Sequence, residues 1–124
     1  MSVKSYRDLR LWREGIELAV AVYEGTERFP KREMFGLTAQ MRRAACSIPS
    51  NIAEGCARQG TPEFLHFLHV ARGSLAELDT QILLSQRLGY LQPGGAVPLD
   101  ARIEAVGKML SGLISSLKPV GGEP

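Results

Sequence analysis

Hydrophobic residues recur at intervals of three and four along most of the chain, which is the spacing of one face of an α-helix. Four such runs follow one another, over residues 9 to about 26, 37 to about 55, 61 to about 88 and 98 to 117. Gly and Pro residues mark the breaks between them, and no run alternates with the period of a strand. The pattern therefore predicts an all-α domain of four helices.

The hydrophobic faces of successive runs fit one another as antiparallel hairpins. Facing positions should pair Leu9 with Ile52 and Tyr23 with Leu37, and the later runs pair in the same way. This favours an antiparallel up-down-up-down four-helix bundle over residues 1–118, followed by a disordered tail at 119–124. Pro49 falls inside the second run without interrupting its register, so we expect it to kink that helix rather than end it.

The first helix carries two hydrophobic seams, although one bundle needs only one. We expect the seam that fits the hairpin register with the second helix to face the core: Leu9, Trp12, Ile16, Ala19 and Tyr23. The surplus seam then predicts a subunit interface formed by Leu11, Gly15, Leu18 and Val22. The alternative is that the surplus seam makes a wide core contact under a loop.

A polar stripe follows one side of the second helix and contains few lysines. Its candidate members, with one residue of the third helix, form a predicted structural polar network: Gln40, Arg43, Ser47, Asn51, Glu54 and Glu77. The hairpin register places Arg43 opposite Glu77 and Ser47 near Ser74. An internal Arg43–Glu77 pair is the favoured interpretation, because a partly buried arginine needs a partner. A groove for a nucleic-acid backbone or a protein partner is the alternative.

The net charge gives little evidence about function, whereas hydrophobicity indicates a location. A formal net charge of +2 is too small to indicate nucleic-acid binding by itself. No hydrophobic stretch is long enough to cross a bilayer and the first residues lack a secretory signal, so we expect a cytoplasmic protein without a membrane partner. Cys46 and Cys56 lie about 15 Å apart along one predicted helix, so they cannot bridge each other.

Candidate chemistry is sparse. No serine triad, phosphate-binding loop or dinucleotide-binding glycine pattern is present, so we expect neither an enzyme nor a cofactor. Glu63 and His66 have the Glu-x-x-His spacing of di-iron bundles, but the second such motif is missing and His69 is the only other histidine, so a metal-binding bundle is the least favoured hypothesis. Arginine suits phosphate groups, and the candidate nucleic-acid ligands are Arg42, Arg58 and Arg72.

Several segments carry a family resemblance. They include Leu9, Trp12, Phe29-Pro30, Glu33, Gly36-Leu37, Arg42-Arg43-Ala44-Ala45, the run SIPSNIAEG at 47–55, Ala71-Arg72-Gly73-Ser74, Glu77 and Leu88-Gly89-Tyr90. In these the chain resembles the bacterial 23S rRNA intervening-sequence proteins. The resemblance implies a four-helix bundle assembled as a homopentamer, without established enzymatic activity. It also implies kinship with the accessory protein of diversity-generating retroelements, which associates with a reverse transcriptase and with RNA or DNA. A protein-interaction scaffold without nucleic acid is the alternative function.

Overall fold

A computed structural model describes residues 5–118, and within that range every regular element is helical. The four long helices are α1 (Arg10–Thr26), α2 (Leu37–Ala57), α3 (Thr61–Arg87) and α4 (Pro93–Leu117). Two short 3-10 helices, η1 (Tyr6–Asp8) and η2 (Lys31–Glu33), precede α1 and α2. The all-α class with four helices is therefore confirmed, while the predicted tail at 119–124 lies outside the described residues.

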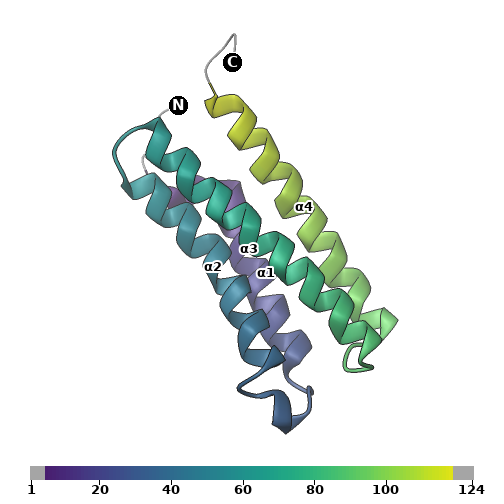
Figure 1. Ribbon diagram of the computed structural model, residues 1–124. Helices are drawn as coiled ribbons and strands as arrows, with labels where there is room; N and C mark the ends of the chain where they lie inside the picture. The colour runs from purple at the N-terminus through teal and green to yellow at the C-terminus, as the bar shows by residue number, and fades with distance from the viewer. Residues whose placement is uncertain (1–4, 119–124) are drawn as a thin grey trace.

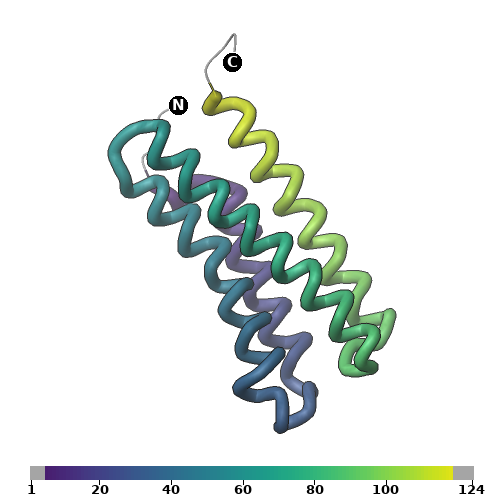
Figure 2. The backbone as a smooth tube through the Cα atoms, in the orientation of Figure 1, coloured from purple at the N-terminus to yellow at the C-terminus, as the bar shows by residue number. Residues whose placement is uncertain are grey.

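The helices pack as a bundle in which successive helices run in opposite directions (Figures 1 and 2). Within the described range, the backbone of α1 lies close to α2 and α4 and that of α3 to α2 and α4, whereas the diagonal pairs are farther apart. The α1–α2 side of the bundle is therefore opposite the α3–α4 side. No helix among residues 5–118 combines the length and hydrophobicity needed to cross a membrane.

The core uses the other seam of α1 from the one that we expected. The buried residues of α1 are Leu11, Gly15, Leu18, Val22 and Thr26, here called the core seam. Leu18 and Val22 have no exposed surface. The prediction that Leu11, Gly15, Leu18 and Val22 form a subunit interface is therefore wrong, because these side chains are already covered by the rest of the chain. The seam of Trp12, Ile16, Ala19 and Tyr23 is only partly covered.

Gly15 explains how closely α1 approaches α2. A Cβ atom at Gly15 would lie 3.5 Å from the Cβ of Pro49, so the two helices meet there with almost no side chain between them. The α2 helix continues through Pro49, as predicted, and the proline is buried in this contact. Gly15 thus permits a close approach within the chain rather than between subunits.

The starts of the third and fourth helices differ from the prediction. Gly60, at φ 91°, precedes α3, so Thr61 is its first residue rather than its cap. The α4 helix begins at Pro93, five residues before the expected start, because proline is favoured in the first turn and burial of Ala96 and Leu99 outweighs the low helix propensity of Gly94 and Gly95.

Glu33 joins the two connections at one end of the bundle. One carboxylate oxygen accepts a hydrogen bond from the backbone N–H of Leu37 at 3.1 Å, at the start of α2. The other accepts from the Tyr90 hydroxyl at 2.9 Å, in the α3–α4 connection. These donors, the Leu37 N–H first, lower the pKa of Glu33 below its ordinary value.

Candidate functional site

The α1–α2 side of the bundle carries hydrophobic residues that the core covers only in part. On α1 they form a stripe, here called the outer seam: Trp12, Ile16, Ala19, Val20 and Tyr23. Val20 and Tyr23 are 47% and 45% exposed. At the end of the same side, between η2 and α2, Met34 is 53% and Phe35 93% exposed. A phenylalanine this exposed favours a surface that is covered by another molecule.

A groove of about 390 Å³ runs along this side between α1 and α2. We call it the basic groove, and its walls include Tyr23, Met34, Phe35, Thr38, Arg42 and Arg43. The Arg42 guanidinium lies 4.6 Å from the centre of the Tyr23 ring and donates to the Thr26 hydroxyl at 2.9 Å. A hydrogen bond with Cys46 is the main cause that raises the pKa of Tyr23, while the charge of Arg42 lowers it. Arg42 thus fixes the shape of the groove.

Thr38 adds an unpartnered polar atom to the basic groove. It is 7% exposed, and its hydroxyl oxygen has no hydrogen-bond partner among the described residues. Buried hydroxyl groups are usually paired, and an isolated one is costly. This oxygen is shielded from solvent, so the exposed part of the groove is defined by its hydrophobic and arginine side chains.

The predicted polar network forms only in part. The Ser47 and Ser74 hydroxyl oxygens lie 2.8 Å apart, as the hairpin register predicted, and the Asn51 side chain donates to the Ser47 carbonyl at 2.7 Å. The ion pairs of the described residues do not include Arg43 with Glu77, so the predicted pair is wrong. Both side chains are exposed, which removes the need for a partner.

The remaining members of the stripe make separate contacts. Gln40 is exposed, and Gln81 donates to Glu77 at 3.3 Å. Glu54 pairs at 2.8 Å with Arg58, the residue that follows α2, and this pair raises the pKa of Arg58.

The three candidate arginines do not share a site. Arg42 and Arg58 lie at opposite ends of α2, about 24 Å apart along the helix. Arg42 holds the end of α1, and Arg58 is paired with Glu54 and lies over the Phe67 ring at 5.1 Å. Only Arg72 remains exposed without an acidic partner in the described range, and its guanidinium lies 3.1 Å from His69 Nδ1. Of the three candidates, Arg72 is therefore the most available to a phosphate group.

Both histidines contact neighbouring side chains on α3. The His66 ring packs edge-on against Phe67 at 5.0 Å, away from any second carboxylate ligand, and His69 contacts Arg72. Among residues 5–118, no three His, Cys, Asp or Glu side chains are close enough to share a metal ion. Both cysteines are free, and burial raises the pKa of the Cys56 thiol.

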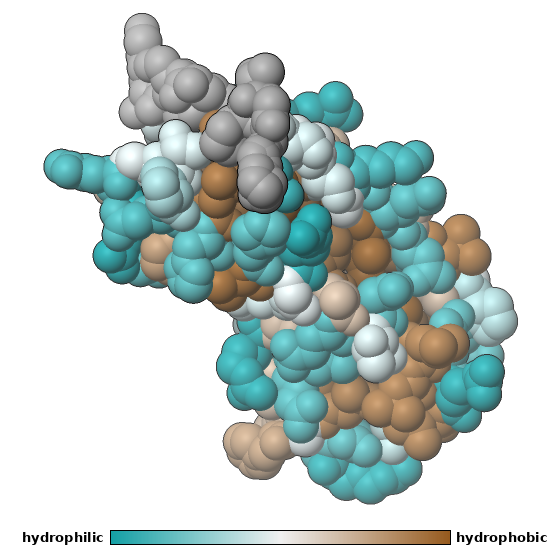
Figure 3. Space-filling view, turned by 45° about the horizontal axis from the view of Figure 1, so that its top comes forward, coloured by the Kyte–Doolittle hydropathy of each residue, from teal (hydrophilic) through white to brown (hydrophobic). Residues whose placement is uncertain are grey.

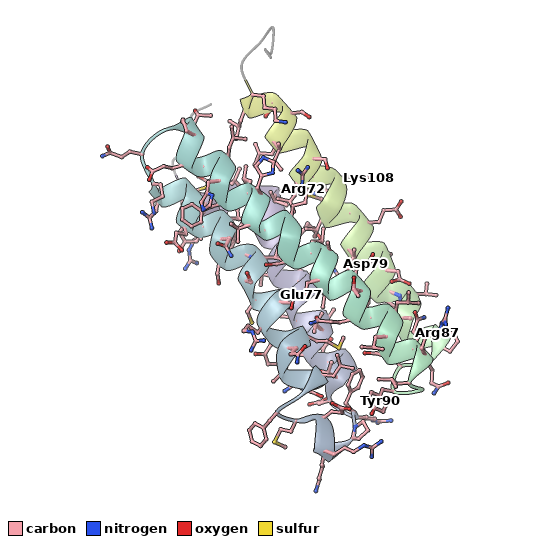
Figure 4. The ribbon with its side chains drawn as sticks, viewed as in Figure 1. Arg72, Glu77, Asp79, Arg87, Tyr90 and Lys108 are labelled. Carbon is pink, nitrogen blue, oxygen red and sulfur yellow. The ribbon has the colours of Figure 1, made fainter. Side chains whose placement is uncertain are left out.

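The opposite side of the bundle carries a second groove, of about 380 Å³, between α3 and α4. We call it the acidic groove, and its walls are Asp79, Thr80, Leu83, Gln86 and Asp100. Asp79 is seen on α3 in Figure 4. Near this end of the bundle, Leu83, Leu84, Leu88 and Val97 are exposed, and Figure 3 shows hydrophobic residues gathered at the lower right of the visible face.

Sequence reasoning missed Phe35 and both grooves. The signal for Phe35 was its position directly before Gly36, outside the periodic part of the second helix, so that no helical face could bury it. The acidic groove is formed by residues of two helices, so it depends on the distance between α3 and α4 and cannot be predicted from either helix alone.

Comparison with known proteins identifies relatives by sequence and by fold. Residues 7–112 match the profile of the 23S rRNA-intervening sequence protein family. The crystal structure of a protein of unknown function from Bacteroides thetaiotaomicron, of the S23 ribosomal protein family, is similar with a TM-score of 0.75. That alignment has 21% sequence identity and covers 84% of this chain and 97% of the other, so it supports the fold alone. No curated protein matches the chain.

Proposed function

This chain belongs to the 23S rRNA-intervening sequence protein family, and we propose that it is a non-enzymatic protein that assembles with copies of itself through the α1–α2 side. The observation that carries the proposal is the outer seam together with Met34 and Phe35. The resemblance noted above implies five copies, and a ring of five is the assembly that we propose.

The exposed hydrophobic surface gives the driving force. Fully burying a phenylalanine side chain stabilises a contact by about 1.5–3 kcal/mol, and Val20, Tyr23 and Met34 add to this. The core seam is buried within one chain, whereas the residues of the outer seam are covered only in part: Trp12 and Ala19 pack against the core, and Val20 and Tyr23 are about half exposed. An interface uses them, and the polar tips of Trp12 and Tyr23 suit such a boundary.

Replacing Val20 by glutamate tests this proposal. The charge would have to be buried in the interface, so we expect the mass measured by light scattering to fall while the helical circular dichroism is retained. Val70→Glu is the matched control, because Val70 is 39% exposed on α3, outside the α1–α2 side. Unchanged mass for Val20→Glu would show that the outer seam is not the interface.

Contact with nucleic acid through the assembled ring is a second candidate, favoured by the exposed Arg72. A single chain with a net charge of +2 binds phosphate poorly, but a ring repeats Arg72 around one axis, and weak contacts then add together. Such binding should weaken steeply with salt. Arg72→Ala should flatten the dependence of log affinity on log salt. If the intact assembly binds neither RNA nor DNA at about 50 mM salt, the protein-interaction scaffold is favoured.

A further inference from the structure

The two grooves lie on opposite sides of the bundle. Tyr23 and Arg42 place the basic groove between α1 and α2, whereas Leu83 and Asp100 place the acidic groove between α3 and α4. Because the α1–α2 side is opposite the α3–α4 side, a second copy seated on one groove leaves the other groove of the same chain open. Every chain therefore carries two separate surfaces on which another copy could dock.

The charges of the two grooves are complementary. The basic groove has Arg42 and Arg43 in its walls, and the acidic groove has Asp79 and Asp100. Nearby, Arg102 lies 3.8 Å from Glu14 of α1 and is already paired. Arg87, at the end of α3, is exposed and lies outside the walls of the acidic groove.

The hydrophobic parts of the two sides also correspond. The Phe35 side chain is almost fully exposed in the wall of the basic groove. Leu83 contributes exposed hydrophobic surface to the wall of the acidic groove. A phenylalanine that inserts beside Leu83 would bury both side chains, while Arg43 would approach Asp79 or Asp100.

We propose that the α1–α2 side of one copy docks on the α3–α4 side of the next, with Phe35 in the acidic groove and Arg43 facing its aspartates. This inference rests on the proposed self-assembly and specifies which surfaces meet. Contacts between two different surfaces repeat from copy to copy and close into a ring when the rotation between neighbours allows it.

A symmetric contact between two basic grooves is disfavoured by the same charges. It would place Arg42 and Arg43 of one copy against those of the other, and like charges in a contact oppose association. A contact between two acidic grooves would likewise bring four aspartates together.

A mixing experiment with two variants separates these arrangements. The first variant, Phe35→Ala with Arg43→Ala, keeps the acidic groove but loses the docking residues. The second, Asp79→Lys with Asp100→Lys, keeps Phe35 and Arg43 but reverses the charge of the groove. Loss of a central aromatic anchor weakens an interface by about 30-fold or more, and in the second variant two lysines would face Arg43 of the next copy, so each variant alone should be monomeric at micromolar concentration. Circular dichroism establishes that each one is folded, and Val70→Ala is the control that leaves both grooves intact.

Mixing the two folded variants in equal amounts should give a pair of chains, with twice the 13.6 kDa mass of one chain, and no larger ring. Only one intact contact is available in the mixture, so assembly stops at two copies. If the mixture stays monomeric, or if either variant alone assembles like the wild type, the proposed pairing of surfaces is wrong while self-assembly stands. A monomeric wild type would instead overturn the proposed function itself.

Discussion

Replacing Leu18 by alanine distinguishes the core seam of α1 from its outer seam. Leu18 has no exposed surface and lies in the centre of the buried face of α1. Truncating a buried leucine loses its burial free energy and leaves a cavity, which together cost about 2–5 kcal/mol. Because a domain is usually stable by only about 5–15 kcal/mol, Leu18→Ala should remove a large share of the stability.

Val20→Ala is the comparison on the same helix. Val20 is about half exposed, so losing its two methyl groups should change the free energy of unfolding by less than about 1 kcal/mol. Urea unfolding followed by far-UV circular dichroism measures both variants, at a concentration where light scattering gives them equal mass, because association would add its own stabilisation.

We expect the unfolding midpoint of Leu18→Ala to fall by roughly 1–2 M urea and that of Val20→Ala to change little. The opposite pattern would refute the reasoning. If Leu18→Ala kept the wild-type midpoint and instead lost assembly, Leu18 would belong to an interface, and the division of α1 into core and outer seams would be wrong.

Three further changes test separate parts of the structure. Folding lowers the pKa of Glu33, so the ionised carboxylate stabilises the bundle above the unfolded pKa. This stabilisation is lost as the pH falls through the folded pKa. The difference in urea midpoint between the wild type and Glu33→Gln should therefore be steady near neutral pH and shrink below about pH 4.3. A difference independent of pH would exclude a role for the carboxylate charge. Ser47→Ala removes the partner of Ser74 and should cost about 1–2 kcal/mol in urea unfolding. Arg43→Ala should change the unfolding free energy of one chain by less than about 0.5 kcal/mol, because Arg43 has no ion pair there; a cost of several kcal/mol would restore the predicted pair with Glu77.

The sequence predicted the bundle well because periodicity reports which face of a helix is hydrophobic. It also placed Ser47 beside Ser74, since neighbouring antiparallel helices with a short connection have little freedom in register. The prediction assigned the two seams of α1 the wrong way round. Both are hydrophobic, and periodicity does not rank two such faces. The hairpin register with α2 favoured the seam of Trp12 and Tyr23, whose polar tips also suit a partly exposed surface.

The candidate site was harder to predict because it depends on distances between helices. Arg43 and Glu77 are opposite each other in register, yet both extend into solvent, where pairing brings little stabilisation. The basic groove arises where α1 ends and η2 redirects the chain, and the helical pattern holds no information about that connection. Phe35 became a candidate only when its exposure was known.

The mass of the wild-type protein in solution tests the central claim of self-assembly most directly. Light scattering at micromolar concentration should give a stable species of five times 13.6 kDa, because the proposed ring would cover the outer seam and Phe35, which one chain leaves exposed. A stable species of 13.6 kDa would contradict the account, since the exposed hydrophobic side of α1 and α2 would then remain open to water.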